Sequence, residues 1–335
     1  MSLPAFFEGP LLALETSCDE TSAAVLRGRS ILSNIVASQI EMHRKWGGVV
    51  PEAASRAHVE AILPAIEEAL SAAGVGLSDI EAVAVTNRPG LVGALSVGVT
   101  AAKALTFVKG VPLLGVHHLE GHLCSPLSVA DLPFPHVCLI VSGGHTELVE
   151  VSELGSYRVL GQTIDDAAGE AFDKGARLLG LGYPGGRAVQ EAALSGRSDR
   201  YPLPKGLKGD TIDFSFSGLK TAVLRLVESE GERLSVADAA ASLQETIVAV
   251  LTERALRAVE RIGARALTLA GGVAANLALR ERLATECSRR GIGFWTPPVE
   301  LCTDNAAMIG LAGSYRLARG ERDGFDLDAT PNAPL

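Results

Sequence analysis

Residues 11–26 read L-L-A-L-E-T-S-C-D-E-T-S-A-A-V-L, an apolar run, a polar turn and a second apolar run. Such runs bounded by turn residues are typical of strands, and 31–37 predicts a third strand directly afterwards. A stretch with helical periodicity follows at 51–73. Its apolar positions are Val59, Ile62, Leu63, Ile66 and Leu70.

The order of these predicted elements occurs twice. The first half continues with a strand at 82–86, a helix at 89–107, a strand at 112–116 and a short helix with two histidines. The second half restarts at Val137 with three strands, then helices, strands at 266–272 and 292–296, and a last helix from Asn305. Strands that alternate with helices imply mainly parallel pairing and layered α/β lobes. We predict two similar lobes, 1–132 and 133–335, with a ligand cleft between them and the last helix as a candidate to pack back on the first lobe.

Composition bounds the class of protein. The 335 residues, 47% hydrophobic and 21% charged, leave room for two apolar cores. The N-terminus has no basic region of a signal peptide, and the apolar stretch 91–102 stops at Lys103, too early to span a bilayer. Five cysteines without a C-x-x-C pair point to a reducing compartment. We therefore expect a cytoplasmic protein without a membrane segment.

The net charge of −9 argues against a protein that binds nucleic acid by charge alone. Such a substrate would require a local basic surface or a helper subunit. One candidate surface lies in a Gly/Pro-rich region, although a solvated loop is the simpler interpretation. Its residues are Arg187, Arg197, Arg200, Lys205, Lys208 and Lys220.

The stretch V-H-H-L-E-G-H, 116–122, contains a pair of possible metal ligands. On a helix His118 and His122 share one face, as the histidines of H-E-x-x-H metalloproteases do. Glu120, however, lies about 200° around the axis from His118, where it could not activate a metal-bound water. Asp304 could be the third ligand, or it could cap the last helix. Two histidines and a carboxylate suit Fe(II) or Zn(II).

Three predicted strand ends could contact phosphate. The turn 15–21 offers hydroxyls and acids, and its simpler interpretation is a β-hairpin turn. The turns 140–146 and 269–276 each contain paired glycines, which let backbone amides approach an anion. None of the three matches a P-loop, which ends in G-K-[ST].

An acidic face is predicted for the helix at 164–174. Asp166, Glu170 and Asp173 follow one another at i, i+4 and i+7. A solvated surface is the default interpretation of such a face. The neighbouring glycine turns also make ribose hydroxyls possible partners of these carboxylates.

A series of longer motifs carries a resemblance to a known family. In order they are E-T-S-C-D-E-T, G-G-V-V-P-E-A-A-S-R-A-H, P-G-L-V-G-A-L, V-H-H-L-E-G-H, V-S-G-G-H-T, I-D-D-A-A-G-E-A-F-D-K, D-F-S-F-S-G-L-K-T, A-G-G-V-A-A-N and C-T-D-N. From about residue 11 to about 320 the chain resembles the universal family of tRNA threonylcarbamoyladenosine synthesis proteins, formerly called O-sialoglycoprotein endopeptidases.

The resemblance implies an actin-like, sugar-kinase-like (ASKHA) fold with a nucleotide cleft between two duplicated lobes. It implies transfer of a threonylcarbamoyl group from threonylcarbamoyl-adenylate to the adenosine beside the anticodon, position 37, in tRNAs that read codons starting with A. One divalent ion per subunit, Fe2+ or Zn2+, would be bound by His118, His122 and Asp304. Contacts to the substrate nucleotide are implied for Ile140, Val141, Ser142, Gly143, Gly144, Asp173, Gly186 and Asn276.

Partners also follow from the resemblance: a TsaB-like actin-fold subunit, a TsaE-like small ATPase and tRNA. The Gly-punctuated helix 91–107 is our candidate for the dimerising face, and core packing is the alternative. Glu15 and Asp19 are our candidates for a general base, because both lie in the first turn. The competing functions are an ATP-dependent kinase or ATPase of the same fold, a metalloprotease, and a structural tRNA-binding module.

Overall fold

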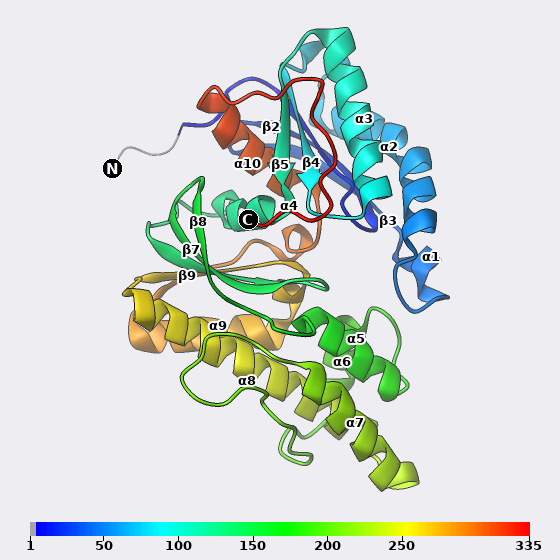
Figure 1. Cartoon of the computed structure of the whole chain (residues 1–335), viewed down its shortest axis with the longest axis vertical. Coiled ribbons are helices and arrows are strands. Elements are labelled where there is room, and N and C mark those ends of the chain that lie inside the picture. Colours follow the sequence, from blue (N-terminus) through cyan, green and yellow to red (C-terminus); the bar gives the residue numbers. More distant parts are fainter. Residues whose placement is uncertain (1–4) are drawn as a thin grey trace. The chain divides into compact units, whose positions relative to one another are not determined.

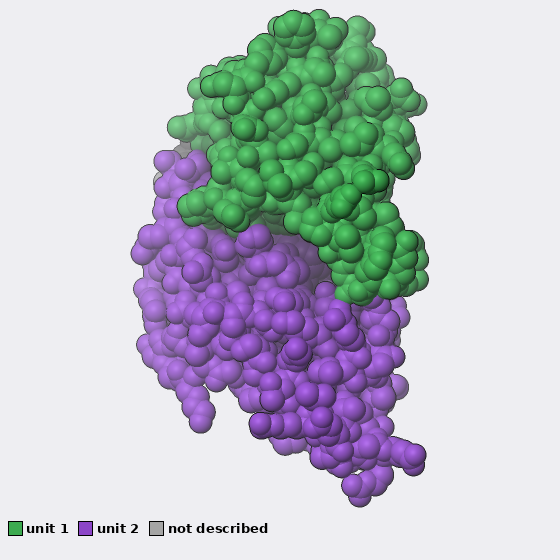
Figure 2. Space-filling model, turned by 45° about the vertical axis from the view of Figure 1, so that its right-hand side comes forward, with its two compact units in different colours: residues 1–131, 304–335 green, residues 132–303 purple. Residues whose placement is uncertain are grey.

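The computed structural model describes residues 5–335, which divide into two compact units (Figure 2). Unit 1 contains the chain up to residue 131 together with 304–335, and unit 2 contains 132–303. We expected the second lobe to run from residue 133 to residue 335. In the structure, residues 304–335 belong to unit 1 instead.

Unit 1 is built on a five-stranded sheet in the order β3-β2-β1-β4-β5. The strands are β1 (Leu11–Glu15), β2 (Glu20–Arg27), β3 (Ser30–Ser38), β4 (Ala82–Arg88) and β5 (Leu113–His117). β1 pairs antiparallel with β2 and parallel with β4, and all five residues of β1 are buried. An apolar run in the middle of a sheet covered on both faces explains this complete burial.

Helices cover both faces of this sheet (Figure 1). The helices of unit 1 are α1 (Ile40–Arg44), α2 (Pro51–Ala73), α3 (Val92–Lys109), α4 (His118–Cys124) and α10 (Ala306–Ala318), with short 3-10 turns at Leu77–Asp79 and Ser125–Ser128. α2 and α3 pack on one face through a core that includes Leu12, Ile66 and Val99. α10 packs on β1, β2 and β4, where a Cβ on Gly313 would lie 2.6 Å from the Cβ of Ala84. Glycine there lets helix and sheet touch.

The helical period of α2 is as predicted, but two of its apolar residues face solvent. Ile62 and Ile66 are buried, while Val59 and Leu63 are 62% and 61% exposed. The rest of the buried face consists mainly of alanines. Small residues pack closely on the sheet, so the larger Val59 and Leu63 are left as an apolar stripe on the outside.

Unit 2 repeats the sheet of unit 1, with the order β10-β9-β6-β7-β8. Its strands are β6 (His136–Val141), β7 (Thr146–Glu153), β8 (Ser156–Gln162), β9 (Ala266–Ala270) and β10 (Gly293–Trp295). Its helices are α5 (Ala168–Leu178), α6 (Gly185–Ala193), α7 (Ser217–Glu230), α8 (Val236–Ile262) and α9 (Leu277–Arg290), with 3-10 turns at Gly231–Arg233, Gly272–Ala275 and Val299–Leu301. In both sheets the first strand pairs antiparallel with the second and parallel with the fourth, so the predicted duplication is confirmed in the topology.

α3 is the one helix among residues 5–335 that is long and apolar enough to cross a membrane by length and composition. It packs on β4 and α2 here, as the core helix of a lobe does.

The segment before β1 follows the surface of unit 1. The backbone N–H of Phe7 donates to the carbonyl of Ser314, and the carbonyl of Phe7 accepts the backbone N–H of Gly28.

Candidate functional site

The two histidines lie one turn apart on α4, a short helix of seven residues that are all buried. β5 leads directly into this helix, and the side chain of His117 caps it by accepting the backbone N–H of Leu119 at 3.2 Å. The rings of His118 and His122 are 4.8 Å apart and nearly perpendicular. A Cβ on Gly121 would lie 2.7 Å from Ile309, so glycine lets α4 approach α10. The predicted helical spacing is confirmed.

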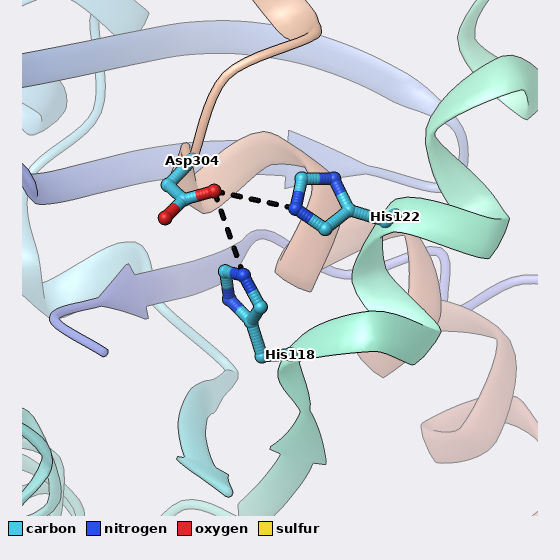
Figure 3. A group of neighbouring side chains, drawn as sticks. All are labelled: His118, His122 and Asp304. Carbon is cyan, nitrogen blue, oxygen red and sulfur yellow. Dashed lines mark ion pairs between the residues drawn. The ribbon is translucent and has the colours of Figure 1, made fainter. Parts of the chain in front are cut away.

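Asp304 meets both histidines from the N-terminus of α10 (Figure 3). Its Oδ1 lies 3.5 Å from Nε2 of His118 and 3.2 Å from Nε2 of His122. From the sequence, Asp304 could be either a metal ligand or the cap of the last helix. The cap is Asn305, whose side chain accepts the backbone N–H of Met308 at 3.1 Å. Asp304 is thereby left to point at the imidazoles.

The three side chains fit a divalent metal. One donor atom from each lies within 4.8 Å of the others. Both ring nitrogens of His122 are buried and make no hydrogen bond of acceptable geometry, although Nε2 faces the carboxylate. Unbonded buried nitrogens are rare in folded proteins, and a metal ion between the three side chains would satisfy Nε2 of His122. Two imidazoles and a carboxylate suit Zn(II) or Fe(II).

In the metal-free protein the charges of these side chains shift one another's pKa values. Burial alone would raise the pKa of Asp304, but the charge of His118 and the close approach of both imidazoles hold it well below its usual value. Burial alone would lower the pKa of His118, but Asp304 and Glu15 raise it well above the usual value. Burial lowers the pKa of His122. In the metal-free protein these charges therefore favour protonation of His118 over protonation of His122.

Glu15 is fully buried behind His118. Its Oε2 lies 3.1 Å from Nδ1 of His118 and accepts from the hydroxyl of Thr86 at 2.5 Å. Its Oε1 accepts from the backbone N–H of Ser17 at 2.5 Å. Burial opposes ionisation, but His118 outweighs it and the pKa of Glu15 is lowered. A carboxylate in this position fixes the ring orientation of a metal-binding histidine.

Asp19 lies in the same turn but is only half-buried. Its carbonyl accepts the backbone N–H of Gln39 at 3.0 Å, which ties the turn to the segment after β3. Next to it, burial and the charges of Asp19 and Asp304 raise the pKa of Glu20 to about 9. Of the two predicted base candidates, Asp19 is the accessible one.

Glu120 points away from the cluster. It forms a buried ion pair with Arg316 of α10 at 3.3 Å, and Arg316 also donates to the carbonyl of Gly115. This contact holds α4 on α10. The sequence argument against a metalloprotease thus agrees with a structural role for Glu120.

In unit 2, β6 ends in the glycine turn 140–144. Ile140 and Val141 are buried strand residues, and the hydroxyl of Ser142 accepts from the backbone N–H of Gly144 at 3.3 Å. A Cβ on Gly143 or Gly144 would meet nothing within 4 Å. Open space above exposed glycines suits the close approach of a ligand.

Of the other three predicted nucleotide contacts, Asp173 and Asn276 make local structural hydrogen bonds, whereas Gly186 has open space around it. Asp173 accepts the backbone N–H of Gly185 at 2.7 Å, at the start of α6, where Gly186 also has open space above it. Asn276 caps α9 through Leu279, and its amide donates to the side chain of Gln244 at 2.9 Å.

Gly169 supports the turn 140–144 but was not among the residues that the sequence predicted for the site. A Cβ there would lie 2.6 Å from the carbonyl of Ser142, so this glycine lets α5 sit against the turn 140–144. The carbonyl of Ser142 also accepts its backbone N–H at 3.1 Å. In the third turn, Gly271 has a φ of +91° and would clash with Val141 if it carried a side chain. The only local signal for Gly169 was its place in A-A-G-E.

Several charged side chains of unit 2 form ion pairs with one another. Asp166 precedes α5, and both Asp166 and Glu170 pair with Lys174, at 2.7 and 3.0 Å. The predicted single acidic helical face is therefore not formed as expected, because Asp166 is not helical. Within the candidate basic region three arginines pair with acids, as Arg187–Glu191, Arg197–Asp199 and Arg200–Asp238.

Comparison with known proteins agrees with this geometry. Residues 30–311 match the family model described as TsaD: tRNA N6-adenosine threonylcarbamoyltransferase. Proteins of that name from Anaeromyxobacter dehalogenans and Symbiobacterium thermophilum are 55% and 54% identical, over 96% and 98% of this chain and 98% and 97% of theirs.

Solved structures show the fold. Full-length HypF, with phosphate and nucleotide bound, has a TM-score of 0.62 at 15% identity and is matched over 95% of this chain and 47% of HypF. An activator of 2-hydroxyisocaproyl-CoA dehydratase from Clostridium difficile has a TM-score of 0.54 at 14% identity, over 93% of this chain and 96% of the activator. Both share the two-lobed ASKHA architecture. The chain belongs to the TsaD family of tRNA N6-adenosine threonylcarbamoyltransferases.

Proposed function

We propose that this protein transfers the threonylcarbamoyl group from threonylcarbamoyl-adenylate to the N6 amine of the adenosine at position 37 of tRNAs that read codons starting with A. The observation that carries the proposal is the buried convergence of His118, His122 and Asp304, in a chain 55% identical to proteins of that name. The donor is a mixed anhydride and already activated, so the protein has mainly to position it and to stabilise charge.

His118, His122 and Asp304 would bind one divalent ion, Fe2+ or Zn2+, which as a Lewis acid would polarise an oxygen of the donor. Around it, Glu15 would hold His118 in the orientation that presents Nε2.

The leaving AMP is assigned to the glycine turns of unit 2. Backbone amides with open space above them, at Gly143, Gly144 and Gly186, support contacts to its phosphate and ribose. Asp173, which anchors the start of α6, would keep Gly186 in place.

Asp19 is our candidate for the proton acceptor. In the transfer the amine nitrogen attacks the carbamoyl carbon, the bond from that carbon to the phosphate oxygen breaks, and AMP leaves with the electron pair. The amine proton would pass to the carboxylate of Asp19, which is accessible, whereas both oxygens of Glu15 already accept hydrogen bonds.

A TsaB-like subunit would dock on α2 and α3, and a TsaE-like ATPase would complete a cytoplasmic assembly. α2 and α3 pack side by side, and a Cβ on Gly93 would lie 2.4 Å from the hydroxyl of Ser55. Val59, Leu63 and Val92 expose 58–62% of their surface on these helices. Leu63→Asp should abolish co-elution with the partner in gel filtration, while Leu194→Asp, on an exposed site of unit 2, should not.

The decisive experiment is single-turnover transfer. Purified protein and its partners are mixed with labelled donor and an unmodified tRNA transcript, and wild type is compared with His118→Ala. Label on tRNA with wild type and its loss with the variant is the expected result. Transfer by both would reduce the histidines to a structural role, and no transfer by competent wild-type components would overturn the proposed function.

A further inference from the structure

The segment between β3 and α2, residues 39–50, carries an exposed indole. Trp46 is 49% exposed, whereas most large apolar side chains of unit 1 are buried. Nζ of Lys45 lies 4.2 Å from the centre of the Trp46 ring, and the ring of His43 lies 5.8 Å away on the buried side. Gly47 and Gly48 follow, and a Cβ on Gly48 would meet nothing within 4 Å. The half-exposed indole therefore has a cation over its ring and, at Gly48, backbone with open space beside it.

The indole is held in place by a buried histidine. His43 is inaccessible to solvent, accepts the backbone N–H of Val50 through Nδ1 at 3.3 Å, and contacts Gln39 Oε1 through Nε2 at 3.2 Å. Its carbonyl accepts the backbone N–H groups of Trp46 and Gly47 at 3.0 and 3.1 Å. An aromatic side chain on such a supported turn loses little entropy when it binds a partner.

The same segment is attached to the turn that carries the candidate base. The backbone N–H of Gln39 donates to the carbonyl of Asp19 at 3.0 Å. His58 of α2 holds that turn from the other side, with Nε2 3.0 Å from the carbonyl of Cys18 and Nδ1 2.7 Å from the hydroxyl of Thr21. A nucleic acid that presents its adenosine to Asp19 would thus have Trp46 on an adjoining segment.

Of the cations in this segment and the first turns of α2, Lys45 is the one without an ion pair and could contact a phosphate. Arg44 pairs with Glu41 at 2.9 Å, and Arg56, one helical turn into α2, pairs with Glu52 at 2.8 Å. Within residues 5–335 Lys45 has no ion-pair partner. Because the chain carries a net charge of −9, a lysine that lies over an exposed indole and has no ion pair within residues 5–335 is a specific feature rather than part of a general basic surface.

We propose that Trp46 and Lys45 bind the unpaired anticodon loop of the tRNA substrate, with one base stacked on the indole and a neighbouring phosphate at Lys45. Proteins recognise single-stranded RNA in this way, by stacking bases on aromatic side chains next to cationic groups. A single indole among cations and glycines fits a base better than it fits the broad apolar patch of a protein interface. The inference rests on the proposed function, since it assigns a contact to that substrate.

The test measures RNA binding apart from catalysis. Trp295→Phe leaves Trp46 as the sole indole of the two in the chain, and its emission is followed during titration with an unmodified anticodon stem-loop, with partner subunits present. Stacking predicts quenching that saturates with the RNA. Measured instead by the anisotropy of a fluorescently labelled stem-loop, Trp46→Ala should weaken binding about tenfold, equivalent to roughly 1.4 kcal/mol, and Trp46→Phe should restore most of it. Lys45→Gln should weaken binding and flatten its salt dependence. Phe325→Ala, which removes another exposed aromatic of unit 1, should leave binding unchanged.

Kinetics separate this inference from the proposed function. In the transfer assay Trp46→Ala should raise KM for tRNA about tenfold and leave KM for threonylcarbamoyl-adenylate unaltered. Wild-type transfer with unaltered tRNA binding by Trp46→Ala would overturn the RNA contact. Loss of assembly with the partner subunits, at unchanged affinity for the stem-loop, would do so too and would assign the indole to a protein interface. Absence of transfer by wild type would instead overturn the proposed function.

Discussion

At the scale of single residues, the candidate site assigns different tasks to similar carboxylates. Asp304 faces two imidazole nitrogens, Glu15 lies behind one of these rings, and Asp19 is half-buried in the neighbouring turn. Burial and hydrogen bonding decide these tasks, because a carboxylate with both oxygens engaged is a poor proton acceptor for a substrate.

The two acids of the first turn should therefore respond differently to isosteric substitution. Glu15→Gln should weaken metal affinity by about 10- to 100-fold, since it removes the charge that orients His118. Asp19→Asn should retain metal and lower the single-turnover rate by about 100-fold or more. Metal titration and rapid-quench transfer measure the two effects. Full transfer rates in both variants would show that neither acid acts as a base.

Metal binding should depend on pH through His118. The raised pKa of His118 in the metal-free protein means that the ring remains protonated at pH values above 6.5, its usual pKa. A metal requires the unprotonated ring, so below the raised pKa each bound ion displaces a proton and affinity should fall about tenfold per pH unit. Calorimetry in buffers of different ionisation enthalpy would measure the released proton. His122, with a lowered pKa, should contribute little near neutrality. Affinity that is constant from pH 6 to 8 would contradict this account.

At the scale of elements, α10 carries Asp304 and depends on close contact with the sheet. Gly313→Ala would place two Cβ atoms 2.6 Å apart, and Ala84 cannot rotate away because its Cβ is fixed to the strand. We expect a loss of about 1 to 3 kcal/mol in unfolding free energy from such overpacking. Urea denaturation of unit 1 followed by circular dichroism would measure the loss. Gly218→Ala on α7, where a Cβ meets nothing within 4 Å, is the matched control and should be neutral or slightly stabilising. Equal stability of the two variants would mean that α10 can shift at little cost.

The sequence predicted elements better than contacts between them. The strand–turn–strand at 11–26 and the helix at 51–73 are local patterns, and both are present. The burial of Glu15 depends on Thr86 and His118, which lie 71 and 103 residues further along the chain. The local pattern contained no information on these partners, so Glu15 resembled any acid in a turn. The choice between Asp304 and Asn305 as cap likewise depended on two histidines far away in sequence.

At the scale of the whole molecule, unit 2 is one continuous segment and unit 1 is two. Unit 2 has its own core, formed by residues such as Leu139, Phe172 and Leu251. A fragment of residues 132–303 should therefore unfold cooperatively by itself. A fragment of residues 1–303 should bind no metal and should lose the transition of unit 1, because it lacks α10 and Asp304. Native-like metal binding by 1–303 would show that the two histidines suffice.

The position of Asp304 also has a consequence for the birth of the protein. The histidines leave the ribosome about 180 residues before Asp304, which at ordinary elongation rates is roughly 10 to 40 seconds. During that interval the nascent lobe carries an incomplete metal site on a sheet whose covering helix has not been made. Metal loading at this site would consequently be a late step of maturation, and a chain that terminates before Asp304 would be marked as defective by its failure to retain the ion.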